Sequence, residues 1–411
     1  MATRAFPVLT ETPSHPLPRP NRPEGTIYGR LCRGSGWFSH NLKESRHMAH
    51  ARMTAAVLAL LLISFSPVYS AQGVSPNDTA RYLAGLTPSA GSPLARLSGE
   101  RGWVQHARVL NQAWKRIEKN QLGPIRAWSK IHVPGGRKQM LYMFSGPDFL
   151  YASAFYPNAE TYVLSALEPV GQIPNLAKYP PHARAGALQE LRGSMQAVLS
   201  YSFFITKHMK SDLNTGNLRG ALPVLYVFLA RAGNTINKVE FIALNPDGLA
   251  VPRGAQRVKG SSPGVRIAFI DRKGQSRTLY YFQTDLSNGG LKRSGFRAFS
   301  EALGPADALV KSASYLLHSG SFTLARDFLL KQSNVIVQDD SGIPLRHFPK
   351  GVWELNPFGK YIGPINIFPK RYQREMRQLF SNGRARKIKF GIGYRWRTQE
   401  TNVLLAIKEK P

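Results

Sequence analysis

The chain has 411 residues, of which 43% are hydrophobic, 10% aromatic and 19% charged, a globular composition that excludes bulk disorder. It holds 55 Lys and Arg against 24 Asp and Glu, a formal net charge of +31, so its surface attracts anions. The length fits one large domain or two ordinary ones.

The N-terminal segment divides into two parts before any globular pattern begins. Residues 1–47 are rich in Pro and Arg and have no helical or strand period, so we predict an upstream, non-structural extension. Residues 48–71 join a basic start to the apolar run AAVLALLLISF and to small residues at Ser70 and Ala71, which predicts a cleaved signal peptide. The alternative, a membrane anchor, needs roughly 20 apolar residues, and Pro67 interrupts the run. We therefore expect a periplasmic or secreted protein.

Cysteine usage is compatible with export. The chain has a single cysteine, Cys32, which lies in the extension. A chain cut after the signal would contain no disulfide, thiolate nucleophile or Cys-ligated metal. This suits a bacterial periplasm, although a Cys-poor cytosolic protein would look the same.

From about residue 77 onward, helical and strand patterns alternate along the chain. Helical periods are expected at 103–128, 184–209, 221–233, 296–303, 321–331 and 372–380. Strands are expected at 140–146, 161–167, 239–245, 265–271, 278–285, 334–337, 387–394 and 402–408. In residues 387–394, Ile388, Phe390 and Ile392 share one face while Lys387 and Lys389 take the other, which is typical of a half-buried strand.

These elements predict an α/β fold. No repeat of fixed period is present, and no Pro- or Ser-rich linker divides residues 77–411. The widest loop, residues 246–264, is interpreted as an excursion between adjacent strands. We predict one large α/β domain over residues 77–411, with a mixed, largely central sheet flanked by helices. Two subdomains meeting near residue 215 are the alternative.

The motif QDDSGIP, residues 338–344, places Asp339 and Asp340 directly after a predicted strand. Strand ends are where α/β proteins hold ligand groups, so either carboxylate could bind a cation or act as a general base. The alternative is an ordinary turn, in which one Asp accepts backbone hydrogens and the other pairs with an Arg.

The motif KSASYLLH, residues 311–318, is a second candidate. In a helix, Lys311, Ser314 and His318 would share one face, and a Lys or His beside a Ser can activate it as a nucleophile. The alternatives are a polar helix face with a satisfied His, or a strand that scatters the three side chains.

Further carboxylates also follow predicted strands. Asp148 comes after a Gly-Pro turn at a helix N-cap position, a role that alone explains an Asp there. Glu168 and Asp285 end two other strands. If these strands are parallel and adjacent, their carboxylates and the Asp339–Asp340 pair gather on one rim of the sheet.

Several cofactor and metal motifs are absent. The sequence has no GxGxxG after the first strand, no GxxxxGK[ST], no HExxH and no His pair at i and i+4, so we expect neither a nucleotide cofactor nor a zinc centre.

Residues 370–397 are strongly basic, with one acid and interleaved aromatics. The candidate binding residues are Lys370, Arg374, Arg377, Arg386 and Lys389. In an exported protein their counter-charges would be an anionic envelope polymer or lipid headgroups; nucleic acid would apply only in the cytosol. The alternative is a solvated basic face.

Four phrases, FSGPDFLYASAFYPNAETYVLSALEPVG, LYYFQTDLSN, KSASYLLHSGSF and QDDSGIPLR, together resemble an uncharacterised family of exported bacterial proteins, from about residue 100 to the end. The resemblance implies export and the boundaries above, and no catalytic role. The sequence thus predicts a protein that binds an anionic envelope component through a basic face. The alternative is an extracytoplasmic hydrolase using Asp148, Asp339 or Asp340 with Lys311, Ser314 or His318.

Overall fold

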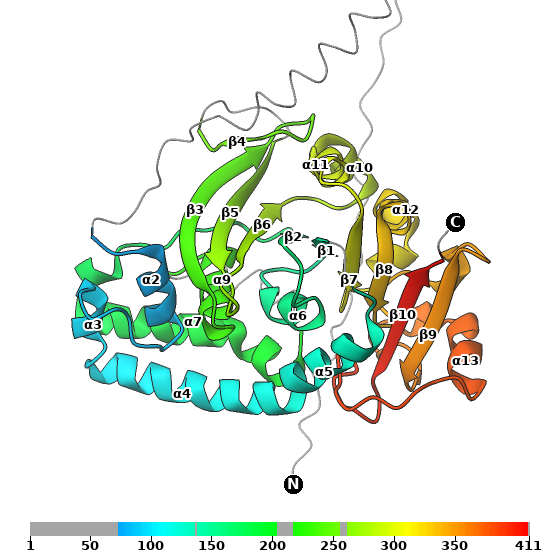
Figure 1. Ribbon diagram of the computed structural model, residues 1–411, viewed down its shortest axis with the longest axis horizontal. Coiled ribbons are helices and arrows are strands. Elements are labelled where there is room, and N and C mark those ends of the chain that lie inside the picture. The colour runs from blue at the N-terminus through cyan, green and yellow to red at the C-terminus, as the bar shows by residue number, and fades with distance from the viewer. Residues whose placement is uncertain (1–72, 136–137, 204–216, 255–260, 410–411) are drawn as a thin grey trace, which may run out of the picture. The chain divides into compact units, whose positions relative to one another are not determined.

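The computed structural model describes residues 73–135, 138–203, 217–254 and 261–409 (Figure 1). These residues belong to one compact unit, Phe65–Pro411. The predicted extension at 1–47, the predicted signal peptide at 48–71 and the end of the predicted helix at 184–209 lie outside the described residues.

The fold is built on one mixed sheet, and the predicted α/β class with a central sheet is confirmed. The strand order across the described residues is β4-β3-β5-β6-β2-β1-β7-β8-β10-β9. The strands are β1 (Gln139–Met143), β2 (Thr161–Ala166), β3 (Thr235–Leu244), β4 (Ala250–Pro252), β5 (Ser262–Ile270), β6 (Ser276–Gln283), β7 (Ala306–Val310), β8 (Ser333–Gln338), β9 (Trp353–Gly359) and β10 (Asn402–Lys408).

The five central strands, β6, β2, β1, β7 and β8, run parallel to their neighbours. Antiparallel strands extend the sheet on both sides, through β5, β3 and β4 at one edge and β10 and β9 at the other. Strand β2 pairs with β6, so elements from either side of residue 215 share one sheet. Strands β3 and β5 pair directly, as expected for an excursion at 246–264.

Two core clusters cover the two faces of the sheet. Along β1, Met140 and Tyr142 belong to the first cluster, while Leu141 and Met143 belong to the second, as the alternation of a strand requires. The first cluster includes side chains from α2 (Pro76–Leu83), α3 (Pro93–Leu97), α4 (Arg101–Ile117), α5 (Gly123–His132), α6 (Phe149–Phe155), α7 (Pro181–Tyr201) and α9 (Ala221–Arg231). The second includes side chains from α10 (Asn288–Arg293), α11 (Phe296–Ala302), α12 (Thr323–Gln332) and α13 (Arg374–Ser381).

The predicted helix at 103–128 is a continuous helical path with a π-helical turn, Glu118–Leu122, between α4 and α5. Pro124 has no N–H to continue the i→i−4 ladder, and the N–H of Gly123 bonds to the carbonyl of Glu118, five residues back. A proline thus explains the wide turn, and π-helical turns often occur at functional sites.

One predicted strand is wrong. Residues 387–394 form no strand; only isolated bridges join Arg386 to Phe358 and Ile392 to Arg395. The predicted alternation is nevertheless present, because Ile388, Phe390 and Ile392 are buried in the first cluster. Strand β10 is already paired on both sides, and the edge strand β9 is met only at the bridge from Arg386 to Phe358, so the segment adds no strand to the sheet. Residues 311–318, for which a helix and a strand were both open, form neither and contain only a short 3-10 turn at Leu316–His318.

Strand β7 is the central element that the sequence pattern missed. Its five residues, ADALV, are all buried, and Asp307 interrupts the short apolar run that would have indicated a strand. It lies between β1 and β8 and carries the KSASYLLH motif at its carboxyl end.

Candidate functional site

The carboxyl ends of the five parallel strands meet at one edge of the sheet, which we call the carboxyl edge. Following the strand order, the first residues beyond these strands include Asp285 after β6, Glu168 after β2 and Asp148 after β1. Lys311 follows β7, and Asp339 and Asp340 follow β8. The sheet order therefore brings together the carboxylates that the sequence places after separate strands.

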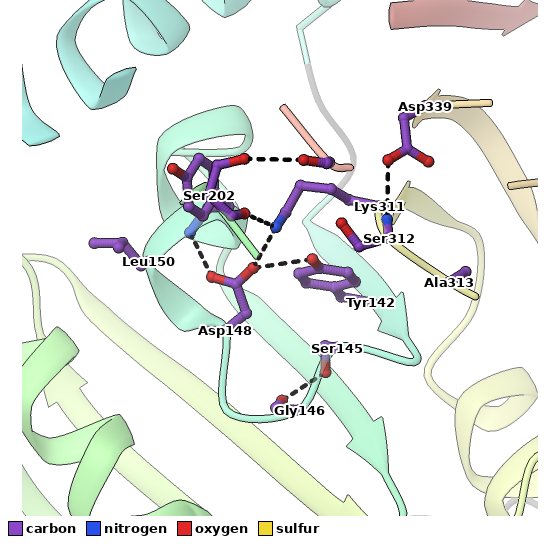
Figure 2. Close-up of polar contacts among 12 residues, drawn as sticks. Tyr142, Ser145, Gly146, Asp148, Leu150, Ser202, Lys311, Ser312, Ala313 and Asp339 are labelled. Atoms are coloured by element: carbon purple, nitrogen blue, oxygen red, sulfur yellow. Dashed lines mark hydrogen bonds and ion pairs between the residues drawn. The ribbon is translucent and has the colours of Figure 1, made fainter. Parts of the chain in front are cut away.

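Lys311 and Asp148 form a buried ion pair at the centre of this edge (Figure 2). Asp148 caps helix α6 through Oδ1, which accepts from the backbone N–H of Tyr151 at 3.1 Å, as predicted for this position. Its Oδ2 accepts from the hydroxyl of Tyr142 at 3.0 Å. The Lys311 ammonium also donates to the carbonyl of Ser202 and lies 4.3 Å from the centroid of the Tyr151 ring.

Asp339 holds the loop after β8 against the loop after β7. One carboxylate oxygen accepts from the backbone N–H of Ser341 at 3.0 Å, within the QDDSGIP turn. The other accepts from the N–H of Ser312 at 3.0 Å (Figure 2). Burial raises the pKa of Asp339, and these hydrogen bonds act in the opposite direction. Both oxygens therefore serve the loops, which matches the turn interpretation of this residue.

Asp340 points to a different set of partners. The Tyr315 hydroxyl donates to one of its oxygens at 2.7 Å, and the Asn402 amide donates to the other at 3.2 Å. Burial, reinforced by the neighbouring charge of Asp339, raises the pKa of Asp340 to about 7. The arginine ion pair of the turn interpretation is not found among the described residues, where Arg395 lowers this pKa only through its field.

The three predicted partners in KSASYLLH do not come together. Ser314 Oγ lies 3.0 Å from the hydroxyl of Tyr394, while Lys311 is bound to Asp148. The His318 ring packs against Tyr315, with centroids 5.2 Å apart. Burial, together with Arg346 and Arg371, lowers the pKa of His318 to about 4. A Ser314 nucleophile activated by Lys311 or His318 is thus not assembled here.

Backbone strain is concentrated at the carboxyl edge. The non-glycine residues with positive φ in the described part of the chain are Phe144, Ser202, Ser312, Ser314 and Tyr315. All except Ser202 follow β1 or β7, and Ser202 bonds to Lys311. Such residues cost about 1–3 kcal/mol each and cluster at functional sites. Ser312 was missed by sequence reasoning, and no motif at this position signals a left-handed conformation.

The basic residues at 370–397 do not share one surface. Helix α13, with Arg374 and Arg377, packs through Met376 and Phe380 into the second core cluster. Lys389 follows Ile388, which packs into the first core cluster. The stretch therefore passes from one face of the sheet to the other. The two remaining candidates are Lys370 and Arg386. Lys370 lies in the short turn before α13. The Arg386 guanidinium lies 4.2 Å from the centroid of the Phe358 ring.

Part of this stretch nevertheless lines a pocket of about 500 Å³, which we call the basic pocket. Arg116 and Lys119 enter it from the end of α4 and the π-helical turn, and Lys389 and Arg397 from the C-terminal segment. Its wall contains no Asp or Glu among the described residues. The pairing of α4 with residues 389–397 was not foreseen, because the sequence separates them by more than 200 positions.

Neutral groups complete the basic pocket. The Trp396 ring lies in its wall, and the Arg397 guanidinium is 5.2 Å from that ring's centroid. The side-chain oxygen of Gln121 is buried without a hydrogen-bond partner among the described residues. Tyr151 and Ser202 also line the pocket, and both contact Lys311 on their other side.

In the described ranges, no helix is long and apolar enough to cross a membrane. No three His, Cys, Asp or Glu side chains in this part of the chain are grouped to hold a metal ion. No protein-family model, curated protein or solved structure matches the chain.

Proposed function

We propose that the protein is exported and binds a phosphate-bearing component of the cell envelope in the basic pocket. The observation that carries this proposal is the convergence of four cations, with no carboxylate in the wall, on one concave site. An anion placed there is attracted by all four charges at once. The contact of Arg397 with Glu400, at 3.8 Å, offsets only one of them.

The geometry favours a site for one anionic group over a diffuse basic face. A volume of about 500 Å³ lies within the range of small-molecule sites. Asn120, Gln121 and Thr398 can hydrogen-bond to neighbouring hydroxyls of the ligand. A glycerol phosphate unit or a phosphorylated sugar presents both kinds of group.

Because the four cations are near the surface, binding should weaken steeply with salt. We suggest measuring the affinity for three probes: a glycerol phosphate polymer, lipopolysaccharide, and vesicles containing phosphatidylglycerol. The first two test a polymer source of the phosphate and the third a lipid source. We expect either the polymer probes or the lipid vesicles to bind at least tenfold more tightly than the probe of the other source.

The test variant is Arg116→Gln with Lys389→Gln, which removes two pocket charges. The matched control is Lys292→Gln with Lys350→Gln, which removes two charges from exposed positions elsewhere. We expect at least a tenfold loss of affinity for the first variant and less than a twofold loss for the control. Equal losses would show that net charge, not the pocket, attracts the anion, and would refute the proposal.

Export is tested separately. The signal pattern at 48–71 supports cleavage near residue 71. Cell fractionation of a tagged protein, followed by N-terminal sequencing, should find the processed chain outside the cytosol. Recovery of the uncut chain in the cytosol would refute export, and with it the proposal that the ligand belongs to the cell envelope.

A further inference from the structure

A second cavity, of about 110 Å³, lies at the carboxyl edge of the sheet, and we call it the edge cavity. Its wall comes from the segments that follow four parallel strands: Phe144 after β1, Glu168 after β2, Asp285 after β6 and Ser312 after β7. In parallel sheets such crevices, beyond the carboxyl ends of strands, are the usual place for ligands.

The charge of the edge cavity is opposite to that of the basic pocket. Glu168 and Asp285 line it, and its wall contains no Lys, Arg or His among the described residues. In a chain with a net charge of +31, a concave site with carboxylates and no cation is unexpected. Its field favours a positively charged ligand group.

Glu168 is the buried carboxyl of this cavity. The residue is only 5% exposed, and its Oε2 has no hydrogen-bond partner among the described residues. Its backbone is fixed, because the Tyr281 hydroxyl donates to its carbonyl oxygen at 2.9 Å. Burial raises the pKa of Glu168, and a hydrogen bond from its own backbone N–H acts in the opposite direction, while no cation in the described part of the chain lowers it. A buried carboxylate oxygen without a partner is costly, and a bound cation would relieve that cost.

Ser312 supplies a second unsatisfied group. Its Oγ is buried without a hydrogen-bond partner among the described residues, and its backbone has a φ of 53°. Two other wall residues, Phe144 and Ser314, have φ values of 63° and 49°. The fold thus maintains strained backbone around a cavity in which Glu168 Oε2 and Ser312 Oγ are unpaired, which is typical of a ligand site.

The remaining wall limits the size and polarity of the ligand. The rings of Phe144 and Phe322 lie with centroids 5.9 Å apart, and Leu286 and Leu316 add aliphatic surface. A cavity of roughly 150 Å³ holds a benzene molecule, so about 110 Å³ suits a somewhat smaller group. A short alkyl chain fits this space and these walls.

We propose that the edge cavity binds a small primary amine, whose ammonium group pairs with Glu168 and donates to Ser312 Oγ while its alkyl chain lies against Phe144 and Phe322. Asp285 contributes to the field from the mouth of the cavity. Its carboxylate oxygens already accept from the N–H and the hydroxyl of Ser287, each at 2.9 Å, so Glu168 is the free acceptor.

The test uses the full chain and three probes of the same shape: n-propylammonium, 1-propanol and propionate. Binding is followed by ligand-observed NMR titration. We expect the ammonium probe to bind at least tenfold more tightly than the alcohol, and propionate not to bind. Equal binding of the alcohol and the ammonium probe would overturn the proposal, and so would the absence of ammonium binding.

Variants then locate the site. Glu168→Gln keeps the side-chain shape, and we expect it to weaken ammonium binding at least tenfold; Ser312→Ala should weaken it several-fold. The control is Glu160→Gln, which neutralises a half-exposed carboxylate paired with Lys138 and should leave binding unchanged. If Glu168→Gln fails to fold, the comparison of probes on the unmodified chain and Ser312→Ala still decide. Unchanged binding in a folded Glu168→Gln variant would overturn the proposal.

Discussion

The Lys311 Nζ atom lies 3.0 Å from Asp148 Oδ2, and both side chains are only 1% exposed. This contact joins the end of β7 to the N-cap of α6. Because Lys311 also donates to the carbonyl of Ser202, it connects the end of α7 to the same point. One ammonium group therefore holds three segments that are distant in sequence.

We predict that Asp148→Asn destabilises the protein by about 3–5 kcal/mol, because it leaves the buried Lys311 charge without its counter-ion. The double variant Asp148→Asn with Lys311→Met should be less destabilised than the sum of the two single variants. The measurement is denaturant-induced unfolding of all four proteins.

The matched control is the ion pair of Lys238 and Glu240. Lys238 Nζ lies 2.7 Å from Glu240 Oε1, and the lysine side chain is 40% exposed. Lys238→Met should cost no more than about 1 kcal/mol. A similar small cost for Asp148→Asn would show that Lys311 is hydrated or neutral in the folded protein.

The sequence was sufficient for most of the fold because amphipathic periods are local signals. The pattern at 103–128 predicted α4 and α5, and apolar runs predicted β1, β2 and β8. Strand β7 was missed because it is short and Asp307 interrupts its apolar run. Residues 387–394 alternate as a strand does, but they form no ladder with the sheet, and only Arg386, just before them, bridges to the edge strand β9.

The sites were less predictable, because they depend on contacts between distant segments. The sequence predicted that Asp148, Glu168 and Asp339 lie on one rim of the sheet, provided that the strands before them are parallel and adjacent. The partners of the carboxylates could not be predicted: Lys311 forms an ion pair with Asp148, and the Tyr315 hydroxyl donates a hydrogen bond to Asp340. The basic pocket combines α4 with a C-terminal segment, a pairing that no local pattern encodes.

Asp340 gives a pH-dependent prediction. Its pKa is about 7 in the folded protein against an ordinary 3.8, so between these values the folded state holds a proton that the unfolded state releases. The protonated Asp340 side chain therefore contributes fully to the stability of the fold at low pH, and this contribution is lost as the pH rises towards 7. Asp340→Asn does not titrate, so relative to the unmodified protein its stability should rise over this range.

The check is the difference in unfolding free energy between the two proteins, measured from about pH 4 to about pH 8. Asp339, whose pKa is also raised by burial, raises the pKa of Asp340 through its charge, so the difference reports the titration of the pair. A difference that stays constant with pH would mean that Asp340 is ionised throughout, as in an exposed turn.

His106 should show the opposite slope. It is fully buried, its Nε2 lies 2.7 Å from the carbonyl of Leu83, and its Nδ1 lies 3.1 Å from Arg192. Burial lowers the pKa of His106 to about 4 from 6.5. Its contribution to stability is thus present above pH 6.5 and is lost as the pH falls towards 4.

His106→Gln removes this titration. The unmodified protein should be the more stable above pH 6.5, and its advantage over the variant should shrink steadily below that pH. His318, whose pKa is also lowered to about 4, remains in both proteins and cancels in the difference. An advantage that grows on acidification would indicate that His106 is protonated in the folded state.

Gly393 provides the last prediction, because it lies against Asp339 with a φ of 63°. A Cβ at this position would lie 1.7 Å from Asp339 Oδ2, and that oxygen is fixed by the N–H of Ser312. We expect Gly393→Ala to destabilise the protein by more than about 4 kcal/mol. The control Gly383→Ala has a φ of 71° and no atom within 4 Å of the added Cβ, so it should cost only about 1–2 kcal/mol.

A double-variant cycle separates the clash from the backbone strain. Asp339→Ala removes the oxygen that the new methyl group would meet, so Gly393→Ala should cost markedly less in that background. The remaining cost should approach that of Gly383→Ala, since both then report only the left-handed conformation. Denaturant unfolding curves of the four proteins give the cost in unfolding free energy of Gly393→Ala with and without Asp339. If Gly393→Ala costs the same with and without Asp339, the close approach of the two residues does not determine the stability of this edge of the sheet.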